Sequence, residues 1–249
     1  MNTFSNHPHI NVLLTDRHGG CSQHPYHSLN LGTHVNDHLP DVIENRRLLA
    51  EKHHLAASDF VYMNQVHGTD VRVITTNASP INDCDAMITT VPGLVLMVLV
   101  ADCVPMVFAD VRKNVVAVAH AGWRGTVGGI GAKVIAAMCE GWDCCAEDIH
   151  VIIGPSIGAC CYNVGEEVLH AIDDTHPEMR SSIIRKGNQH FFDLQLANVT
   201  HLIGQGVLPG HIDRHEQCVS CHSDQWFSYR ASGGTTGRFG MGIWIDSAC

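Results

Sequence analysis

The strongest constraint on the fold is an apolar run that stops abruptly at a histidine. Val115–Thr126 reads VVAVAHAGWRGT, so the run ends in His120 and opens into a glycine-rich turn that contains Arg124. A continuous apolar run of this kind is typical of a strand buried on both faces. A histidine and an arginine suit a core poorly, but they suit a place where a ligand contacts side chains and backbone together. We therefore expect a functional site where this strand ends.

Two other apolar runs repeat the pattern. Leu94–Val100 reads LVLMVLV and is followed by Asp102 and Cys103, and Phe60–Val66 reads FVYMNQV and is followed by His67. Ligand sites in open α/β sheets gather at the ends of strands. The sequence therefore predicts that these strand ends lie close together.

The mixture of short strands and helices predicts the fold class. Hydrophobic residues make up 45% of the 249 residues and charged residues 16%, so a sizeable core is available. Strands and helices do not alternate regularly, which favours a mixed sheet over a parallel one. We expect a single α/β (α+β) domain over residues 1–249, with a mixed β-sheet core flanked by helices.

Apolar periodicity and turn residues predict the individual elements. Strands are expected at Ile10–Leu14, Phe60–Met63, Val71–Ile74, Leu94–Val100, Met106–Phe108, Val115–Ala119, Ile149–Ile153, Trp226–Tyr229 and Met241–Ile245. Helices are expected at Asp41–His53, Val127–Cys139, Glu166–Ile172 and Asp193–Gln205. Asp41 and Glu44 are expected to form a capping box, and Asp193 to cap its helix.

Charge and cysteine usage limit the partners and the compartment. A formal charge of −10 lacks the basic footprint that a general nucleic-acid-binding surface needs. The longest apolar run, Leu94–Ala101, is far shorter than the ~20 residues that cross a bilayer. Eleven cysteines without a visible secretory signal favour a reduced, cytoplasmic setting. We expect no nucleic-acid or membrane partner, and the oligomeric state stays open.

Three of the strand-end residues form a candidate metal site. His67 and His120 supply imidazoles and Cys103 a thiolate, a ligand set that suits zinc. Three protein ligands would leave a fourth position for water or substrate, as in catalytic zinc sites. The pattern alone leaves another interpretation open, namely two strand-end histidines and an inert buried cysteine.

Several long motifs resemble those of a known family, the laccase-domain or YfiH-like proteins. The matching stretches are TDRHGG and YHSLNLGTHVND within Thr15–Asp37, ENRRLL (Glu44–Leu49), NQVHG (Asn64–Gly68), CDAMIT (Cys84–Thr89), ADCVP (Ala101–Pro105), HAGWRGT (His120–Thr126), GPSIGACCYNVG (Gly154–Gly165), FDLQLANV (Phe192–Val199) and FSYRASGGTTGR (Phe227–Arg238). The family was once described as multicopper polyphenol oxidases and is now regarded as zinc-dependent purine nucleoside phosphorylases. Its fold is also similar to that of bacterial deamidase toxins.

The resemblance implies the site and the reaction. It assigns the zinc ligands, and with them catalysis, to His67, Cys103 and His120. It implies that a purine nucleoside (adenosine, inosine, guanosine or methylthioadenosine) and inorganic phosphate become free base and ribose 1-phosphate, with adenosine deaminase as a side activity. The chain departs from the family pattern at Asn36, where glycine is usual, and at Ala231, where a second arginine is common.

Other residues are candidates for substrate contacts and proton transfer. Arg124 and Arg238 could grip phosphate through their forked donors. Asn30 could hydrogen-bond base or ribose, although an asparagine in a turn usually bonds to its own backbone. Asp85 and Asp102 are candidate acid/base groups or supports for the metal ligands, and structural capping fits each equally well.

Alternative functions remain at this stage. Multicopper oxidation needs repeated HxH pairs, and the chain has one, His7–His9, so that chemistry is not expected. Cys103 with His120 as base would make a cysteine hydrolase or deamidase. A purely structural zinc is a third possibility. A peptidoglycan-precursor editing factor, a role attributed to bacterial relatives, is a fourth.

The remaining cysteines are less informative. Cys218, Cys221 and His222 match the haem-attachment pattern CxxCH, but that chemistry belongs to exported proteins, so haem is not expected. Cys218 and Cys221 could form a redox pair or a minor metal site. The others are expected to be small apolar or surface residues: Cys21, Cys84, Cys139, Cys144, Cys145, Cys160, Cys161 and Cys249.

Overall fold

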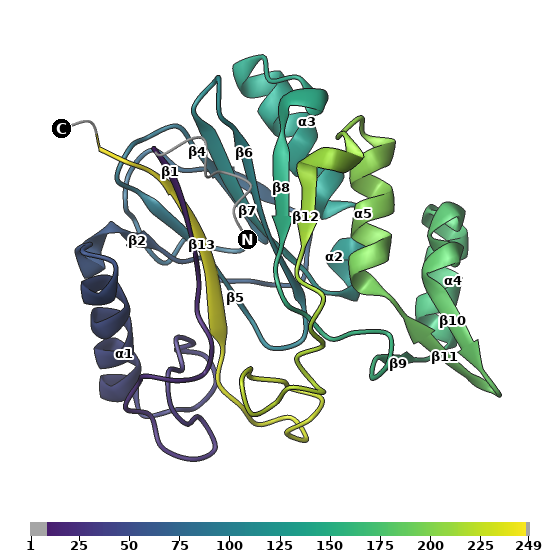
Figure 1. The fold of residues 1–249 in the computed structure, drawn as a ribbon, viewed down its shortest axis with the longest axis horizontal. Helices are drawn as coiled ribbons and strands as arrows, with labels where there is room; N and C mark the ends of the chain where they lie inside the picture. The colour runs from purple at the N-terminus through teal and green to yellow at the C-terminus, as the bar shows by residue number, and fades with distance from the viewer. Residues whose placement is uncertain (1–8, 248–249) are drawn as a thin grey trace.

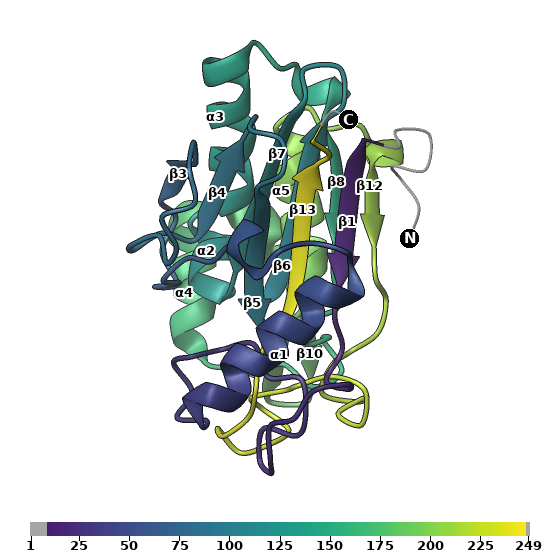
Figure 2. The same ribbon diagram turned by 90° about the vertical axis from the view of Figure 1, so that its left-hand side faces the viewer.

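Two stacked β-sheets between helices form the body of the protein. The computed structural model describes residues 9–247. Helix α1 (Leu39–Lys52) covers one face of a four-stranded sheet, and α3 (Ile130–Trp142) and α5 (Leu194–Gly204) cover the far face of a six-stranded sheet (Figures 1 and 2). The two sheets pack against each other through β5, β6, β7 and β13. The predicted class, a mixed α/β fold flanked by helices, is confirmed.

The four-stranded sheet has the order β1-β13-β5-β2. Its strands are β1 (Ile10–Leu14), β13 (Phe239–Ile245), β5 (Val95–Val100) and β2 (Phe60–Val61). Neighbouring strands are antiparallel except for β2, which runs parallel to β5. Strand β13, near the end of the chain, therefore lies between β1, near its beginning, and β5.

The six-stranded sheet has the order β12-β8-β6-β7-β4-β3. Its strands are β12 (Ile212–Arg214), β8 (His150–Ile153), β6 (Val104–Asp110), β7 (Val115–Ala121), β4 (Ala86–Thr89) and β3 (Val71–Val73). The central pairs are antiparallel and the two edge pairs are parallel. The sheet is therefore mixed, as the irregular order of elements predicts.

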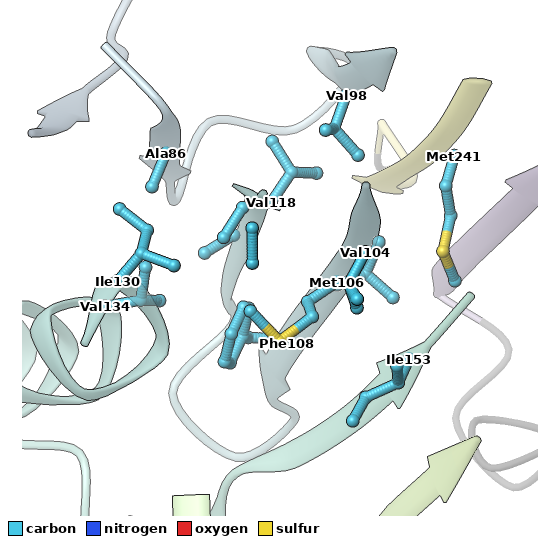
Figure 3. Close-up of a cluster of buried hydrophobic side chains, with 14 of the residues drawn as sticks. Ala86, Val98, Val104, Met106, Phe108, Val118, Ile130, Val134, Ile153 and Met241 are labelled. Atoms are coloured by element: carbon cyan, nitrogen blue, oxygen red, sulfur yellow. The ribbon is translucent and has the colours of Figure 1, made fainter. Parts of the chain in front are cut away.

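Strand β5 shows why its sequence is apolar without interruption. Side chains of a strand alternate between its faces, and Leu96, Val98 and Val100 lie in the core between the sheets, whereas Val95, Met97 and Leu99 pack in the core under α1. Both faces are therefore buried. Figure 3 shows the core between the sheets, where Val98 lies near Val118 and Val104.

Smaller elements complete the fold. Helix α2 (Trp123–Val127) follows β7, and α4 (Glu166–Thr175) lies beside a three-stranded sheet of order β10-β11-β9 at the right of Figure 1. That sheet consists of β10 (Ile183–Lys186), β11 (Gln189–Phe192) and β9 (Asn163–Val164). Short 3-10 helices occur at Ala57–Asp59, Ala146–Asp148, Pro177–Ser182 and Pro209–His211.

Several local predictions need correction. His38, not Asp41, is the N-cap of α1, and no side chain caps it, so the predicted capping box is absent. The predicted helix at Val127–Cys139 is divided, because Gly129 has φ +74° and separates α2 from α3. Trp226–Tyr229 forms turns and not a strand. Trp226 and Phe227 are buried although the segment has no sheet partner, and this produces the apolar pattern, whereas Tyr229 is exposed.

One capping prediction is confirmed. The Asp193 carboxylate accepts a hydrogen bond from the Leu196 backbone N–H (2.9 Å) at the start of α5. Within residues 9–247, no helix is long and apolar enough to cross a membrane. His7 of the HxH pair and Cys249 lie outside the described residues.

Candidate functional site

The structure brings His67, Cys103 and His120 together. One potential ligand atom from each of these three residues, here called the triad, lies within 4.8 Å of the others. The two imidazole rings are perpendicular, with centroids 4.7 Å apart and an interplanar angle of 84°. His120 is buried, Cys103 is partly buried and His67 is exposed, so the triad opens toward solvent at His67.

Sheet geometry places the two inner members of the triad. The chain leaves β5 in one sheet and enters β6 in the other through a short turn that contains Cys103. Asp102 makes this turn possible with φ +101°. Strand β6 then pairs with β7, and Pro105 lies opposite His120. Cys103, two residues before Pro105, therefore lies beside the His120 side of the ladder.

Gly122 lets the triad approach the backbone. A Cβ atom at this position would lie 3.0 Å from Cys103 Sγ and 3.1 Å from His67 Cδ2. The φ of Gly122 is −69°, which any residue adopts, so the need for glycine is one of space. This explains why a glycine follows His120 so closely in the sequence.

Asp85 joins His67 and His120. Its buried carboxylate accepts hydrogen bonds from His120 Nδ1 (2.8 Å) and from the backbone N–H groups of His67 (3.0 Å) and Gly68 (2.6 Å). Burial alone would raise the pKa of Asp85, but His120 and these donors hold it below its usual value. With Nδ1 engaged, Nε2 of His120 is the nitrogen that can face Cys103. Asp85 is thus a positioning residue for both histidines.

Cys103 and His120 stabilise each other's charged forms. Burial opposes ionisation of Cys103, but the neighbouring His120 and His67 lower the pKa of its thiol to about 6. Burial likewise opposes protonation of His120, but Cys103 and Asp85 raise its pKa to about 9. The thiolate is the form of cysteine that binds metals and acts as a nucleophile.

The side chain of Asp102 stabilises the turn that contains Cys103. Its carboxylate accepts hydrogen bonds from Ser228 Oγ (2.5 Å) and from the Arg230 backbone N–H (2.7 Å). Burial raises the pKa of Asp102, although both donors act in the opposite direction. Asp102 thereby ties the Cys103 turn to the segment that leads into β13.

The positive charge of Arg238 interacts with the triad residue Cys103. Burial lowers the pKa of its guanidinium, and the negative charges of Cys103 and Asp102 oppose this shift. Arg238 Nη1 donates to the carbonyl oxygens of Thr236 (2.8 Å) and Gly237 (3.0 Å). Among the described residues, no hydrogen bond engages its Nε or Nη2, so these donors can reach a ligand.

The two other predicted substrate residues lie in different surroundings. Arg124 is exposed in α2, and its guanidinium carbon lies 4.3 Å from the ring centroid of Trp123. Asn30 is fully buried; its amide donates to Gly32 O (3.1 Å) and Asp37 Oδ2 (2.9 Å), and its Oδ1 accepts from the Arg238 backbone N–H (2.8 Å). Asn30 therefore positions the Arg238 backbone, and both polar atoms of its side chain are engaged within the protein.

Sequence reasoning did not single out two residues near the triad. Partial burial, Arg238 and Arg46 lower the pKa of His34, and both triad histidines contribute to the shift. Burial and the negative charge of Cys103 raise the pKa of Tyr162. Both residues lie within motifs of the family, THVND and CCYNVG, and that is the signal that could have identified them.

A cavity of about 210 Å³ lies beside Arg238. Tyr26, His34 and Tyr229 line it together with Arg238 and Thr236. Asn36, which also lines it, has φ +63°, a conformation that favours glycine and that asparagine tolerates. Asparagine can therefore adopt the conformation that this position requires.

Two further groups of potential metal ligands occur among the described residues. Cys160, Cys161, Cys218 and Cys221, here called the tetracysteine cluster, have sulfur atoms within 4.8 Å of one another. His176, Glu178 and His201 form the other group. His176 Nδ1 lies 3.0 Å from Glu178 Oε1, and His201 Nε2 lies 3.6 Å from the same oxygen, so direct side-chain contacts already link this group.

Comparison with known proteins gives consistent relatives. Residues 11–246 match the family model described as multi-copper polyphenol oxidoreductase laccase. The chain is 38% identical over 236 residues to the purine nucleoside phosphorylase YlmD of Geobacillus stearothermophilus, covering 90% of this chain and 86% of that one. It is 33% identical to adenosine deaminase RL5 of an unknown prokaryotic organism, with 94% of each chain covered.

The fold has a close structural counterpart. The crystal structure of the hypothetical protein YfiH from Bacillus licheniformis superposes with a TM-score of 0.92 at 31% identity. The match covers 98% of this chain and 94% of that one. The similarity therefore extends over both sheets and the segments that carry the triad.

Proposed function

The chain belongs to the multi-copper polyphenol oxidoreductase laccase family, and we propose that it acts as a zinc-dependent purine nucleoside phosphorylase. Its substrates are a purine nucleoside and inorganic phosphate. In the reaction the bond between ribose C1′ and the purine nitrogen breaks, and a phosphate oxygen bonds to C1′. The departing purine takes up a proton.

The donor set of the triad supports zinc as the metal. Two imidazole nitrogens and one thiolate are ligands that zinc prefers, and their atoms lie within 4.8 Å of one another. Among residues 9–247, no fourth histidine, cysteine or carboxylate joins this group. A zinc ion held there supplies Lewis acidity at an open coordination position. This convergence of three ligands is the observation that carries the proposal.

Residues around the triad have the properties that phosphorolysis needs. Arg238 has guanidinium donors that no described residue engages, and its charge interacts with that of Cys103. A guanidinium binds phosphate through two parallel hydrogen bonds. Arg124, four residues after His120 and in the first turn of α2, adds a second positive charge on the exposed side. We assign the main phosphate contact to Arg238 and an additional contact to Arg124.

The neighbouring cavity suits the nucleoside. Tyr26, Tyr229 and His34 line it with ring systems on which a purine can stack. Asp85 keeps His120 oriented, and Asp102 keeps the Cys103 turn in place, so both act through the triad. Asn30 contributes by holding the Arg238 backbone.

A phosphate-dependence assay tests the proposal. The purified protein is incubated with adenosine or inosine, with and without inorganic phosphate, and free base and ribose 1-phosphate are measured. We expect phosphate-dependent release of base that is lost in Cys103→Ala and retained in the exposed control Cys145→Ala. Base release that ignores phosphate, or that survives Cys103→Ala, would contradict the proposal.

Adenosine deamination is a second candidate activity, favoured by the relative named adenosine deaminase. The same incubation reports it, because deamination converts adenosine to inosine and releases ammonia without phosphate. We expect this activity to depend on Cys103 in the same way.

The cysteine-hydrolase alternative also has an observation in its favour. Cys103, His120 and Asp85 form a chain of nucleophile, base and carboxylate, and the Cys103 thiol has a pKa of about 6. His67 argues for the metal, because a nucleophile–base pair has no need of a second imidazole on the sulfur. Amide hydrolysis that persists in the presence of a chelator and is blocked by thiol alkylation would favour the hydrolase.

A further inference from the structure

The tetracysteine cluster joins two surface turns that are far apart in the sequence. Cys160 and Cys161 lie in the turn between β8 and β9, and Cys218 and Cys221 lie in the turns between β12 and β13. Cys221 Sγ is 3.5 Å from Cys160 Sγ and 3.4 Å from Cys161 Sγ. No other part of the described chain brings four cysteines together.

The backbone fixes this arrangement. An isolated β-bridge pairs Ser156 with Cys218, and the Val219 N–H donates to Ser156 O (3.0 Å). The Cys161 N–H donates to Gly158 O (3.0 Å) and closes the first turn. The two turns are therefore held side by side by hydrogen bonds that do not involve the sulfur atoms.

Cys218 Sγ has the surroundings of a metal-bound thiolate. It accepts a hydrogen bond from the backbone N–H of Gly158 (3.2 Å), and the backbone N–H groups of Ser220 and Cys221 also favour its thiolate form. A Cβ atom at Gly158 would lie 3.1 Å from Cys218 Cβ and 3.3 Å from Cys160 Sγ, so the turn needs glycine to pass so close. Several N–H donors directed at one sulfur favour a negatively charged acceptor.

The spacing of the sulfurs fits one tetrahedral ion. Zn–S bonds of about 2.3 Å place the sulfurs of a tetrahedral site about 3.8 Å apart. The distances of 3.4 and 3.5 Å, with all four sulfurs within 4.8 Å, agree with that geometry. A disulfide would engage two of the cysteines and leave the others unused, although all four converge.

We propose that Cys160, Cys161, Cys218 and Cys221 bind a second zinc ion in a closed, four-thiolate site. Binding releases the thiol protons to solvent and leaves no open coordination position. The site is structural: it clamps the β8–β9 turn to the segment that precedes β13.

Neighbouring residues connect the tetracysteine cluster to the triad. Tyr162 follows Cys161 directly, and its phenol lies within electrostatic reach of Cys103. Arg230 donates to the carbonyl oxygens of Cys161 (3.4 Å) and Asn163 (3.2 Å), and its own backbone N–H holds Asp102. A zinc ion in the tetracysteine cluster therefore stabilises the segments that support the Cys103 turn.

Metal analysis of the full chain tests the proposal, with no dependence on activity. The protein is purified under reducing conditions with zinc supplied and then dialysed, and its zinc is counted by elemental mass spectrometry. We expect two zinc ions per chain in the wild type and in Cys145→Ser, an exposed cysteine outside the tetracysteine cluster. We expect one in Cys221→Ser and one in Cys103→Ala.

Cobalt substitution provides the second measurement. Cobalt in a four-thiolate site gives an intense sulfur-to-metal charge-transfer absorption, and we expect Cys221→Ser to remove most of it while Cys103→Ala keeps most of it. One metal per chain that Cys221→Ser leaves in place would overturn the proposal. So would a Cys221 disulfide in the reduced, zinc-supplied protein, or the absorption of an iron–sulfur cluster.

Discussion

The triad and the tetracysteine cluster are both built around sulfur, but they draw their ligands from different parts of the fold. The triad lies at the ends of core strands, and the buried Asp85 and His120 anchor it. The tetracysteine cluster lies on two surface turns, where Cys160 and Cys221 are exposed. Three ligands leave an open position, whereas four close the site. The triad is therefore suited to chemistry, and the tetracysteine cluster to holding chain segments together.

Removing a triad ligand should have the largest effect on activity. His67 is exposed, so His67→Ala removes a ligand without opening the core. We expect kcat/KM for phosphorolysis to fall by at least about 100-fold, beyond the loss typical of residues that only support ligands. Steady-state kinetics checks this, and His54→Ala, an imidazole outside every metal group, is the control. If His67→Ala kept its activity, the triad would not be needed for the reaction, and the functional contrast between the triad and the tetracysteine cluster would be lost.

Asp85→Asn should have the next largest effect. The substitution keeps the shape of the side chain but removes the charge that His120 Nδ1 contacts at 2.8 Å. We expect zinc affinity at the triad to fall by about 10–100-fold, as for other supporting carboxylates. Competition with a chromophoric chelator measures this.

The matched control is Asp83→Asn, an exposed carboxylate two residues earlier that bonds to Asn64 (2.7 Å). It should leave the zinc affinity unchanged. Equal affinities in Asp85→Asn and the wild type would show that the carboxylate does not support the triad.

Arg238→Lys should sharpen the assignment of phosphate binding. Lysine keeps the positive charge but loses the fork that binds two phosphate oxygens at once. We expect KM for phosphate to rise about 10-fold, which corresponds to one charge-assisted hydrogen bond, and KM for the nucleoside to change little. Arg185→Lys, on an exposed strand, is the control. A rise confined to the nucleoside KM would move Arg238 to the base or ribose.

Cys221→Ser should have the smallest effect on activity and a clear effect on stability. We expect kcat/KM to change less than about threefold, because this cysteine lies outside the triad. The Tm should fall by about 2–4 °C for each kcal/mol of metal-dependent stability that is lost. Calorimetry with and without chelator measures this. A chelator that lowers the Tm of Cys221→Ser and of the wild type equally would contradict a structural zinc in the tetracysteine cluster.

The sequence anticipated the core strands and the triad better than the surface. Continuous apolar runs such as β5 and β7 are long enough to identify a buried strand and where it stops. The tendency of ligand sites to gather at strand ends predicted that His120 and Cys103 lie together. In the structure β5 and β7 belong to different sheets, and the two residues meet because Cys103 directly precedes β6, the strand that pairs with β7. The short strands of the β9–β11 sheet carry no comparable run, since most of their residues are only partly buried.

The tetracysteine cluster could not be derived from spacing. More than fifty residues separate Cys160 and Cys161 from Cys218 and Cys221. Neither pair is close in the sequence to a second pair of cysteines or histidines at a spacing typical of zinc sites. The bridge between Ser156 and Cys218 and the bond from the Gly158 N–H to Cys218 Sγ bring them together. For Asn30 the sequence left two roles open, a substrate contact and bonding to its own backbone. In the structure its side-chain amide bonds to Gly32, Asp37 and Arg238.

Anomalous X-ray diffraction at the zinc absorption edge, on crystals of the zinc-loaded protein, is the most direct test of the open metal site. We predict a peak within bonding distance of His67, Cys103 and His120, with no fourth protein group as ligand. Absence of a peak at these three residues, or a peak closed by a further side chain, would contradict the account.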